Sequence, residues 1–388
     1  MITFVERNRI TLLQSGAEYF PALIEAFDCA GREIHLETYI FEADGTGRAV
    51  AAALERAARR GVSTYLIVDG FGAKDLDRKL LDEMQSAGVR VLIFRPKISP
   101  WTLKRSRLRR LHRKLAVIDA RIAFVGGINV LDDEGPVQGI PPRFDYAVRV
   151  EGPLLANIYP AAKRLWRLVA ATQFKARRPE TRHLVPDTSA RGAQRAAFLV
   201  RDNLRHRRDI ESAYLEAIGR SRSEILLANA YFFPGISFRR ALTDAAARGV
   251  RVTLLLQGRP DHVLFHYASR ALYGIFLDAG IEIHEYHRSF LHAKVAVFDR
   301  RWSTVGSSNI DPFSLLLARE ANVMIDDCGF ADQLRVSLIR EMEQGATQLK
   351  RERWANEPLP LRAATWVSYG LARLLTGVFA YGGKEEFA

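Results

Sequence analysis

Residues 111–130 read LHRKLAVIDARIAFVGGINV, and residues 291–310 read LHAKVAVFDRRWSTVGSSNI. Both strings follow the pattern H-x-K-x4-D and then G-x-x-N, and the second repeats the first at an offset of 180 positions (292 − 112 for the histidines). Two complete sets at one offset indicate a duplicated half-site that brings two imidazoles to one phosphate. The candidate catalytic and phosphate-binding residues are His112, Lys114, Asp119 and Asn129 in the first set, and His292, Lys294, Asp299 and Asn309 in the second.

The sequence around the two strings repeats as well. Residues 33–40 (EIHLETYI) and 224–231 (EILLANAY) both predict buried strands. An Ala- and Arg-rich helix follows each strand, ends at Gly61 or Gly249, and leads into a Val-rich strand. Because strands and helices alternate in this way, each half is predicted to be an α/β layer with a mixed sheet covered by helices.

The boundary between the halves is predicted at residues 177–194, which are polar, contain two prolines and lack periodicity. This places the first half at residues 1–180, the second at 181–350 and a C-terminal tail at 351–388. A chain of 388 residues is long enough for both halves to bury a proper core.

The net charge of +13 points to an anionic partner, which charge alone cannot identify as nucleic acid, an acidic membrane surface or a phosphate-bearing substrate. The two cysteines provide neither a disulfide framework nor a Cys-rich metal site, which fits a reducing compartment. The first sixteen residues do not read as a secretory signal, and the sequence predicts no spanning helix.

Two segments suggest which anionic partner this is. Residues 95–110 (RPKISPWTLKRSRLRR) precede only the first string and combine six lysines and arginines after Pro96 with Ile98, Trp101, Leu103 and Leu108. Nucleic acid would use the same cations, but the apolar residues favour anionic lipid headgroups. The tail at residues 359–383 is apolar and aromatic but contains Arg362 and Arg373, so it predicts a helix in the membrane interface. The alternative is an amphipathic helix packed on the protein's own body.

Exchange at a phosphodiester needs a nucleophile, a proton donor for the leaving oxygen, and cations near the phosphate. A neutral imidazole can attack phosphorus and form a phosphoramidate, while an imidazolium on the far side protonates the departing alkoxide. His and Lys two positions apart on an extended segment point to the same face, so one strand end presents both. The lysines would then hold the non-bridging oxygens, with the two asparagines as further donors. This arrangement requires no metal or other cofactor.

Four carboxylates accompany the histidines. Glu320 and Asp145 each open an apolar strand after a G-x-x-N turn, and we expect them to orient the imidazoles by hydrogen bonding to one ring nitrogen. Either could instead be an ordinary strand-end residue. Asp119 and Asp299 belong to the repeated candidate catalytic sets, but their position at strand ends favours a structural role in the turn.

The two strings resemble the HKD motifs of the phospholipase D superfamily, and both copies are complete. Residues 259–294 are similar to the corresponding stretch of bacterial cardiolipin synthases, and residues 100–129 resemble their B-type branch. The resemblance implies two tandem α/β domains with the active site at their pseudo-twofold interface, and a metal-independent double displacement through phosphohistidine. It also implies that His112 attacks, that His292 acts as the acid, and that Glu320 and Asp145 stand where the family's supporting acids stand. The longer cardiolipin synthases begin with two spanning helices, which this sequence does not show.

The expected activity is that of a cardiolipin synthase, which transfers a phosphatidyl group from one phosphatidylglycerol to another and releases glycerol. Its partners would be phosphatidylglycerol and the surface of the bacterial cell membrane, where the chain would be peripheral, and nucleic acid is not an obligatory partner. The alternatives are a phospholipase D-type lipid hydrolase, a metal-independent nuclease or phosphodiesterase, and a non-catalytic binding module.

Overall fold

The computed structural model describes residues 2–96, 109–132, 142–173, 184–202, 205–260, 263–311, 314, 318–355 and 359–381. Most of the predicted basic segment, residues 97–108, therefore lies outside the described residues, whereas Arg109 and Arg110 lie within them.

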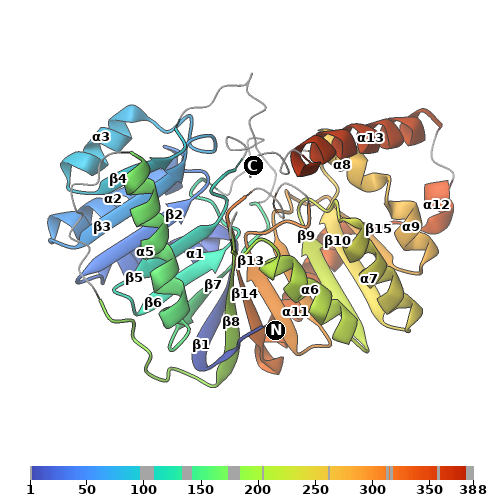
Figure 1. Ribbon diagram of the computed structural model, residues 1–388, viewed down its shortest axis with the longest axis horizontal. Helices are drawn as coiled ribbons and strands as arrows, with labels where there is room; N and C mark the ends of the chain where they lie inside the picture. Colours follow the sequence, from blue (N-terminus) through green and yellow to red (C-terminus); the bar gives the residue numbers. More distant parts are fainter. Residues whose placement is uncertain are drawn as a thin grey trace, which may run out of the picture.

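A single mixed sheet of fifteen strands runs through the described part of the molecule (Figure 1). The strands are β1 (Val5–Gln14), β2 (Glu33–Thr38), β3 (Ser63–Asp69), β4 (Arg90–Phe94), β5 (Lys114–Ile118), β6 (Ile122–Gly126), β7 (Tyr146–Glu151), β8 (Gln194–Arg201), β9 (Glu224–Asn229), β10 (Arg251–Gln257), β11 (Glu282–Tyr286), β12 (Lys294–Phe298), β13 (Trp302–Gly306), β14 (Glu320–Asp326) and β15 (Ala346–Gln348).

The order of the strands is symmetric about the centre of the sheet. From the centre outward, one side runs β1-β7-β6-β5-β2-β3-β4 and the other runs β8-β14-β13-β12-β9-β10-β11, with β15 added at the second edge. β1 and β8 pair antiparallel and join the two sides. Both sides therefore have the same topology, which confirms the predicted pair of α/β halves related by a pseudo-twofold axis. The division at residues 177–194 falls between α5 and β8 and stays a prediction.

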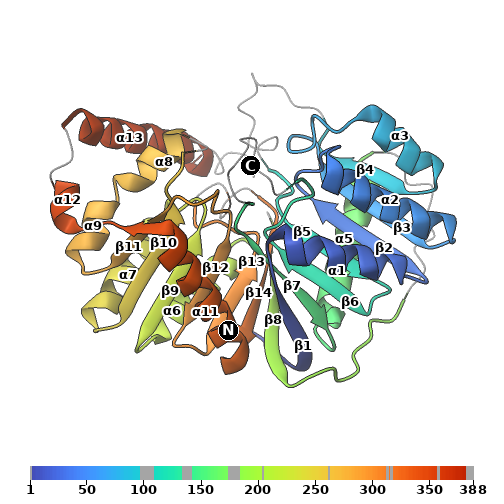
Figure 2. The ribbon, with the colours of Figure 1, turned by 180° about the vertical axis from the view of Figure 1, so that it is seen from behind.

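Helices cover both faces of the sheet. They are α1 (Ser15–Asp28), α2 (Gly45–Arg59), α3 (Arg78–Ser86), α5 (Leu155–Thr172), α6 (Asp209–Arg220), α7 (Ile236–Ala247), α8 (Val263–Arg270), α9 (Tyr273–Asp278), α11 (Cys328–Gly345), α12 (Arg351–Ala355) and α13 (Leu359–Tyr381). In Figure 1, α5, α6 and α7 lie in front of the sheet. Figure 2 shows the opposite face, which α1, α2 and α11 cover. A single apolar cluster contains residues of α5, α11 and the strands of both halves, so the core is continuous across the centre.

The predicted local elements match the structure closely. β2 and β9 occupy the two predicted buried strands, and their residues are buried except Glu224, which is partly buried. α2 and α7 end two residues before Gly61 and Gly249, whose φ angles are both +88°. Only glycine adopts that left-handed conformation without steric cost, so both turns into the following strand depend on it.

Candidate active site

Both His-x-Lys pairs lie at the same edge of the sheet. His112 and His292 lie two residues before β5 and β12, and Lys114 and Lys294 are the first residues of those strands. β5 runs antiparallel to β2 and β12 antiparallel to β9, so the beginnings of β5 and β12 lie at the carboxyl ends of their neighbours. The lysine side chains are almost completely buried, with 2% of Lys114 and none of Lys294 exposed.

The segment before each histidine is hydrogen-bonded to the other half of the chain. The His112 amide donates to the carbonyl oxygen of Arg319 at 3.0 Å, and Leu111 and Arg319 form an isolated bridge. In the symmetric position, the His292 amide donates to the carbonyl oxygen of Phe144 at 2.8 Å. Each histidine is thus placed directly beside the residue that precedes the acid of the other half.

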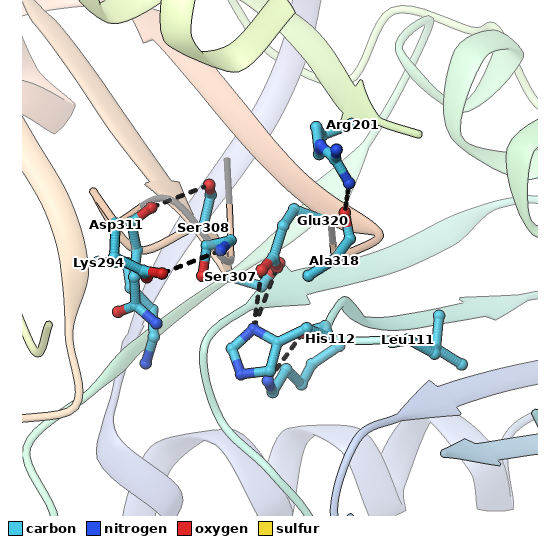
Figure 3. A network of polar contacts seen from close by, with 12 residues as sticks. Leu111, His112, Arg201, Lys294, Ser307, Ser308, Asp311, Ala318 and Glu320 are labelled. Atoms are coloured by element: carbon cyan, nitrogen blue, oxygen red, sulfur yellow. Dashed lines mark hydrogen bonds and ion pairs between the residues drawn. The ribbon is translucent and has the colours of Figure 1, made fainter. Parts of the chain in front are cut away.

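Each imidazole is hydrogen-bonded to the acid that comes from the other half of the chain. Nδ1 of His112 lies 2.9 Å from Oε1 and 3.2 Å from Oε2 of Glu320 (Figure 3). Nδ1 of His292 lies 2.6 Å from Oδ2 of Asp145. For His112, a carboxylate at Nδ1 favours a proton on that nitrogen and leaves Nε2 of the neutral ring with a lone pair for a substrate. Nδ1 of His292 lies 2.7 Å from Lys294 Nζ as well as beside Asp145.

The two lysines give the site a buried positive field. Lys114 Nζ donates to the carbonyl oxygen of His112 at 2.8 Å, and Lys294 Nζ donates to that of His292 and lies 3.6 Å from Asp145 Oδ2. Burial, assisted by the charge of Lys294, lowers the pKa of Lys114 to about 7, and burial lowers the pKa of Lys294 to about 8. Two buried ammonium groups that destabilise each other favour an anion between them.

The same burial acts on the other titratable groups. It lowers the pKa of His112, against the opposing charge of Glu320. It lowers the pKa of His292 well below the ordinary value, and the charges of Lys294 and Lys114 lower it further. Burial also raises the pKa of Asp145 to about 6, although the charge of Lys294 opposes the rise. An anionic phosphate would favour the protonated form of an imidazole beside it, as the proton donor to a leaving oxygen must be, whereas the attacking imidazole has to remain neutral.

The two asparagines lie at the same strand ends. Asn129 accepts a hydrogen bond from the Ile40 amide at 3.1 Å, and Asn309 is 3% exposed. Asn309 Oδ1 is buried and has no hydrogen-bond partner among the described residues. That the two asparagines are donors to a bound phosphate stays a prediction.

Asp119 and Asp299 lie at the opposite ends of β5 and β12 from the histidines. Asp119 accepts hydrogen bonds from the backbone amides of residues 31–33, and Asp299 accepts them from those of residues 222–224. Both have positive φ angles, 52° and 51°, in tight turns. These contacts fit the structural role in the turn that their position favours, and their grouping with the candidate catalytic residues stays a prediction.

Two supporting residues were missed by sequence reasoning. Ser307 Oγ donates to Glu320 Oε2 at 2.5 Å. Its counterpart 180 positions earlier is Gly127, where an added Cβ would lie 2.4 Å from Oδ1 of Asp145. The sequence signal for these two residues was the difference between GSSN in the second string and GGIN in the first. The longer side chain of Glu320 leaves room for the hydroxyl of Ser307, whereas the shorter side chain of Asp145 leaves no room for a side chain at Gly127.

Two further residues fix the position of the histidine segments. Asp69 Oδ2 accepts from the Leu111 amide at 2.9 Å, and Gln257 Oε1 accepts from the Leu291 amide at 3.1 Å. They are the last residues of β3 and β10, and the matching phrases IVDG and LLQG contain them. Among the residues that the structure describes, no group of three or more His, Cys, Asp or Glu side chains is arranged to hold a metal ion.

Each His-x-Lys half-site receives its acid from the opposite half of a duplicated α/β sheet. This arrangement defines a phospholipase D-like protein. The family described as "Cardiolipin synthase, PLD-like domain" matches residues 23–134 and 214–342, and the chain belongs to that family.

Known relatives place the chain more narrowly. It is 40% identical to cardiolipin synthase B of Escherichia coli K12 and 42% identical to that of Salmonella typhi, in both cases over 343 residues, 86% of this chain and 80% of the relative. It is 30% identical to cardiolipin synthase 1 of Staphylococcus epidermidis over 374 residues, 96% of this chain and 74% of the relative. The higher identity to the B-type proteins confirms the resemblance to that branch.

Solved structures support the fold. The phosphatidylserine synthase of Haemophilus influenzae superposes with a TM-score of 0.72 over 97% of this chain and 96% of that chain, at 12% identity. The polyphosphate kinase of Porphyromonas gingivalis gives 0.57 over 96% of this chain and 53% of that chain, at 16% identity. At such identities the likeness concerns the fold alone.

Proposed function

We propose that the chain is a phosphatidyltransferase that makes cardiolipin from two molecules of phosphatidylglycerol. The observation that carries this proposal is the crossed pair of histidine–carboxylate contacts around two buried lysines, His112 with Glu320 and His292 with Asp145. Such a site provides two imidazoles and two fixed cations for one phosphodiester, as exchange at phosphorus requires.

In the first half-reaction, Nε2 of His112 attacks phosphorus of the donor lipid and a P–N bond forms. The P–O bond to the headgroup glycerol breaks, and His292, protonated once the phosphate is bound, gives its proton to the departing oxygen. Glu320 stabilises the positive charge that develops on the attacking ring. The products are glycerol and a phosphatidyl group held on His112. The choice of His112 as nucleophile follows the resemblance to the superfamily.

In the second half-reaction, His292 is neutral and removes the proton from the headgroup hydroxyl of a second phosphatidylglycerol. The hydroxyl oxygen attacks phosphorus, the P–N bond to His112 breaks, and cardiolipin is released. The lysines hold the non-bridging oxygens throughout both steps. A hydrolase would differ only in using water as the acceptor, so exclusion of water from the site decides between the two activities.

We also infer that the chain works as a peripheral protein at a bilayer surface, and that α13 contributes to docking. Within the described residues, no helix is long and apolar enough to cross a membrane. One face of α13 exposes large apolar side chains, while Thr365 and Ala372 on the other face are buried. The exposed apolar residues are Trp366, Val367, Leu371 and Leu374. An apolar face of this kind fits the boundary between headgroups and acyl chains.

The position of α13 supports this inference. It packs along α8 (Figure 1). The ring of Tyr369 lies 5.5 Å from that of Phe233, which follows the carboxyl end of β9. β9 ends at Asn229, the register partner of Lys294. The apolar helix therefore lies at the edge of the sheet that carries the candidate site, where a lipid headgroup would enter.

One assay tests the proposed activity. Purified full-length protein would be incubated with phosphatidylglycerol vesicles, and the products would be resolved by mass spectrometry. Cardiolipin and glycerol in equal amounts are expected. Phosphatidic acid alone would identify a hydrolase, and cleavage of single-stranded DNA with no turnover of lipid would contradict every lipid activity.

A further inference from the structure

Five arginines gather beside the His112 half-site, outside the set of residues that the proposed chemistry uses: Arg95, Arg109, Arg110, Arg201 and Arg319. Their positions are fixed by the backbone. The Arg319 amide donates to the carbonyl oxygen of Arg110 at 2.7 Å, and the Gly70 amide binds the carbonyl oxygen of Phe94, directly before Arg95. The guanidinium of Arg110 lies 3.3 Å from Oδ1 of Asp69 at the end of β3.

Two of these cations differ from Arg110, which forms an ion pair with Asp69. Arg95 and Arg319 are each partly buried, and neither makes an ion pair or a side-chain hydrogen bond to another described residue. Burial lowers the pKa of Arg319 and the charge of Arg113 lowers it further, against the charges of Asp202 and Glu37. Burial and the charges of Arg109 and Arg110 lower the pKa of Arg95, against the charge of Asp69. Guanidinium groups held near each other in a partly desolvated place favour a bound anion.

The carboxylates of this region already have partners. Asp69 accepts from the Leu111 and Phe71 amides as well as from Arg110. Glu37 forms a bidentate pair with Arg113. Glu320 binds His112 and Ser307, and Asp202 accepts from the backbone amides of residues 205 and 206. Within the described residues, none of these carboxylates forms a hydrogen bond or ion pair with Arg95 or Arg319.

In the part of the chain that the structure describes, the other half-site carries different side chains at the positions of Arg95, Arg110 and Arg319. The bridges Leu111–Arg319 and Leu291–Phe144 correspond, so Phe144 stands where Arg319 stands. In the same way, Phe290 stands in place of Arg110 and His287 in place of Arg95. The pseudo-twofold symmetry is thus kept in the reacting groups and broken at these three positions, although the charge of Arg143 acts on His292 and Lys294 in the other half-site.

We propose that Arg95, Arg110 and Arg319 form a binding site for the phosphodiester of the acceptor phospholipid. The inference rests on the proposed function, in which the acceptor has a phosphate of its own. Three carbons and one oxygen separate its attacking hydroxyl oxygen from that phosphorus, so a second phosphate must bind close beside the first. The hydroxyl can reach the side of His292 while the phosphate lies on the arginines, because the glycerol between them is flexible.

This site accounts for the choice of acceptor. Guanidinium groups bind phosphate oxygens with two parallel hydrogen bonds, so the cluster raises the local concentration and fixes the orientation of an anionic acceptor. Water and neutral alcohols gain nothing from it. The cluster therefore favours transfer to phosphatidylglycerol over hydrolysis without taking part in the chemistry at the donor phosphorus.

The test compares acceptors in the full-length enzyme. The Arg95→Gln/Arg319→Gln variant and the wild type would be given phosphatidylglycerol vesicles, with and without ethanol as a neutral acceptor. We expect cardiolipin formation by the variant to fall at least about tenfold, while phosphatidylethanol forms at the rate of the wild type. Arg32→Gln, which removes one exposed charge at the opposite end of the sheet near Asp119, is the matched control and should change neither product.

Other outcomes overturn the proposal. An equal loss of both products would assign the arginines to the donor or to the fold, and an unchanged ratio of products would exclude an acceptor site. A loss of vesicle binding in co-sedimentation that matches the loss of cardiolipin would assign them to general attraction to the bilayer. Inorganic phosphate could also inhibit the wild type but not the variant, while the variant keeps the wild-type preference for forming cardiolipin. That result would assign the site to free phosphate. A wild-type enzyme that forms phosphatidylethanol but no cardiolipin would contradict the proposed function itself.

Discussion

Glu320 opens β14 in the second half of the chain, and its carboxylate lies 2.9 Å from Nδ1 of His112 in the first half. The reverse contact joins Asp145 to His292 at 2.6 Å. Neither half therefore contains a complete histidine–acid pair. The site requires both halves to be held in register across β1 and β8, which explains why the sheet is continuous through the centre of the molecule.

The crossed contacts predict the effect of removing one carboxylate charge. In Glu320→Gln, the ring of His112 loses the partner that fixes its tautomer and stabilises its charge, so we expect kcat to fall by about a hundredfold or more with little change in KM. Ser307→Ala, which removes only the hydroxyl bound to Glu320, should lower kcat much less. Steady-state kinetics on phosphatidylglycerol measure both, and a KM effect alone would argue for a binding role of Glu320.

Gly127 gives a steric test of the reverse pair. A Cβ at this position would lie 2.4 Å from the Asp145 carboxylate, so Gly127→Ala is expected to displace Asp145 from His292 and to abolish most activity. Gly219→Ala in α6 is the control, because its Cβ would meet nothing within 4 Å and alanine favours a helix. If Gly127→Ala folds normally by circular dichroism and remains fully active, the Asp145 contact is not needed for catalysis.

The alanine variants of the two histidines are predicted to differ in whether they accumulate the covalent phosphatidyl intermediate. Both His112→Ala and His292→Ala should lose at least about a thousandfold in turnover, because each imidazole acts in both half-reactions. A phosphatidyl group trapped on protein should be found by intact-mass measurement in His292→Ala and not in His112→Ala. The opposite pattern would exchange the roles of nucleophile and acid.

Binding of phosphate should depend on pH through the lysines. Their pKa values of about 7 for Lys114 and about 8 for Lys294 mean that the unliganded site loses positive charge as the pH rises through this window. Since only the ammonium form attracts phosphate, the affinity for tungstate, an analogue of phosphate, is expected to fall over the same window. Calorimetric titration measures it, and a constant affinity would show that the lysines stay charged.

The same pKa values predict how the free energy of unfolding changes with pH. Folding lowers the pKa of each lysine from 10.5, to about 7 for Lys114 and to about 8 for Lys294. At pH values between the folded-state pKa and 10.5, the unfolded chain therefore binds more protons than the native chain. The contribution of both lysines to the free energy of unfolding is therefore least favourable at pH values below about 7, and it rises as the pH increases towards 10.5. Tungstate should raise Tm most at the lower end of this range, since it stabilises the charged form. Thermal unfolding with and without tungstate tests this, and a larger increase at high pH would be the contrary result.

The exposed face of α13 predicts a docking phenotype. Trp366 and Leu374 are 56% and 65% exposed, so replacing both by serine removes apolar surface without opening the core. We expect weaker co-sedimentation with phosphatidylglycerol vesicles and slower turnover on vesicles. Leu168→Ser on α5, which is 46% exposed on a different part of the surface, is the control and should bind as the wild type does. Equal binding by all variants would remove α13 from the docking surface.

Much of this site was open to prediction because its signals are local. His112 and Lys114, two residues apart on an extended segment, necessarily present both groups at one strand end. The repeat at 180 positions predicted the same arrangement in the second half, and Asp145 and Glu320 were visible as acids that open apolar strands. The turns at Gly61 and Gly249 were equally local, since they depend on the φ angle of one residue.

The remaining features depend on segments far apart in the sequence. Which acid serves which histidine was decided by the antiparallel meeting of the two halves, which pairs His112 with a residue 208 positions away. The cluster around Arg319 arises in the same way, because Arg110 becomes its neighbour only through the Leu111–Arg319 bridge. The sequence by itself determined the reacting groups and the two similar α/β halves, since both follow from short-range patterns of polar and apolar residues. The tertiary structure alone decided the crossing of the acids and the position of Arg319 beside Arg110, because long-range pairing of strands sets those contacts.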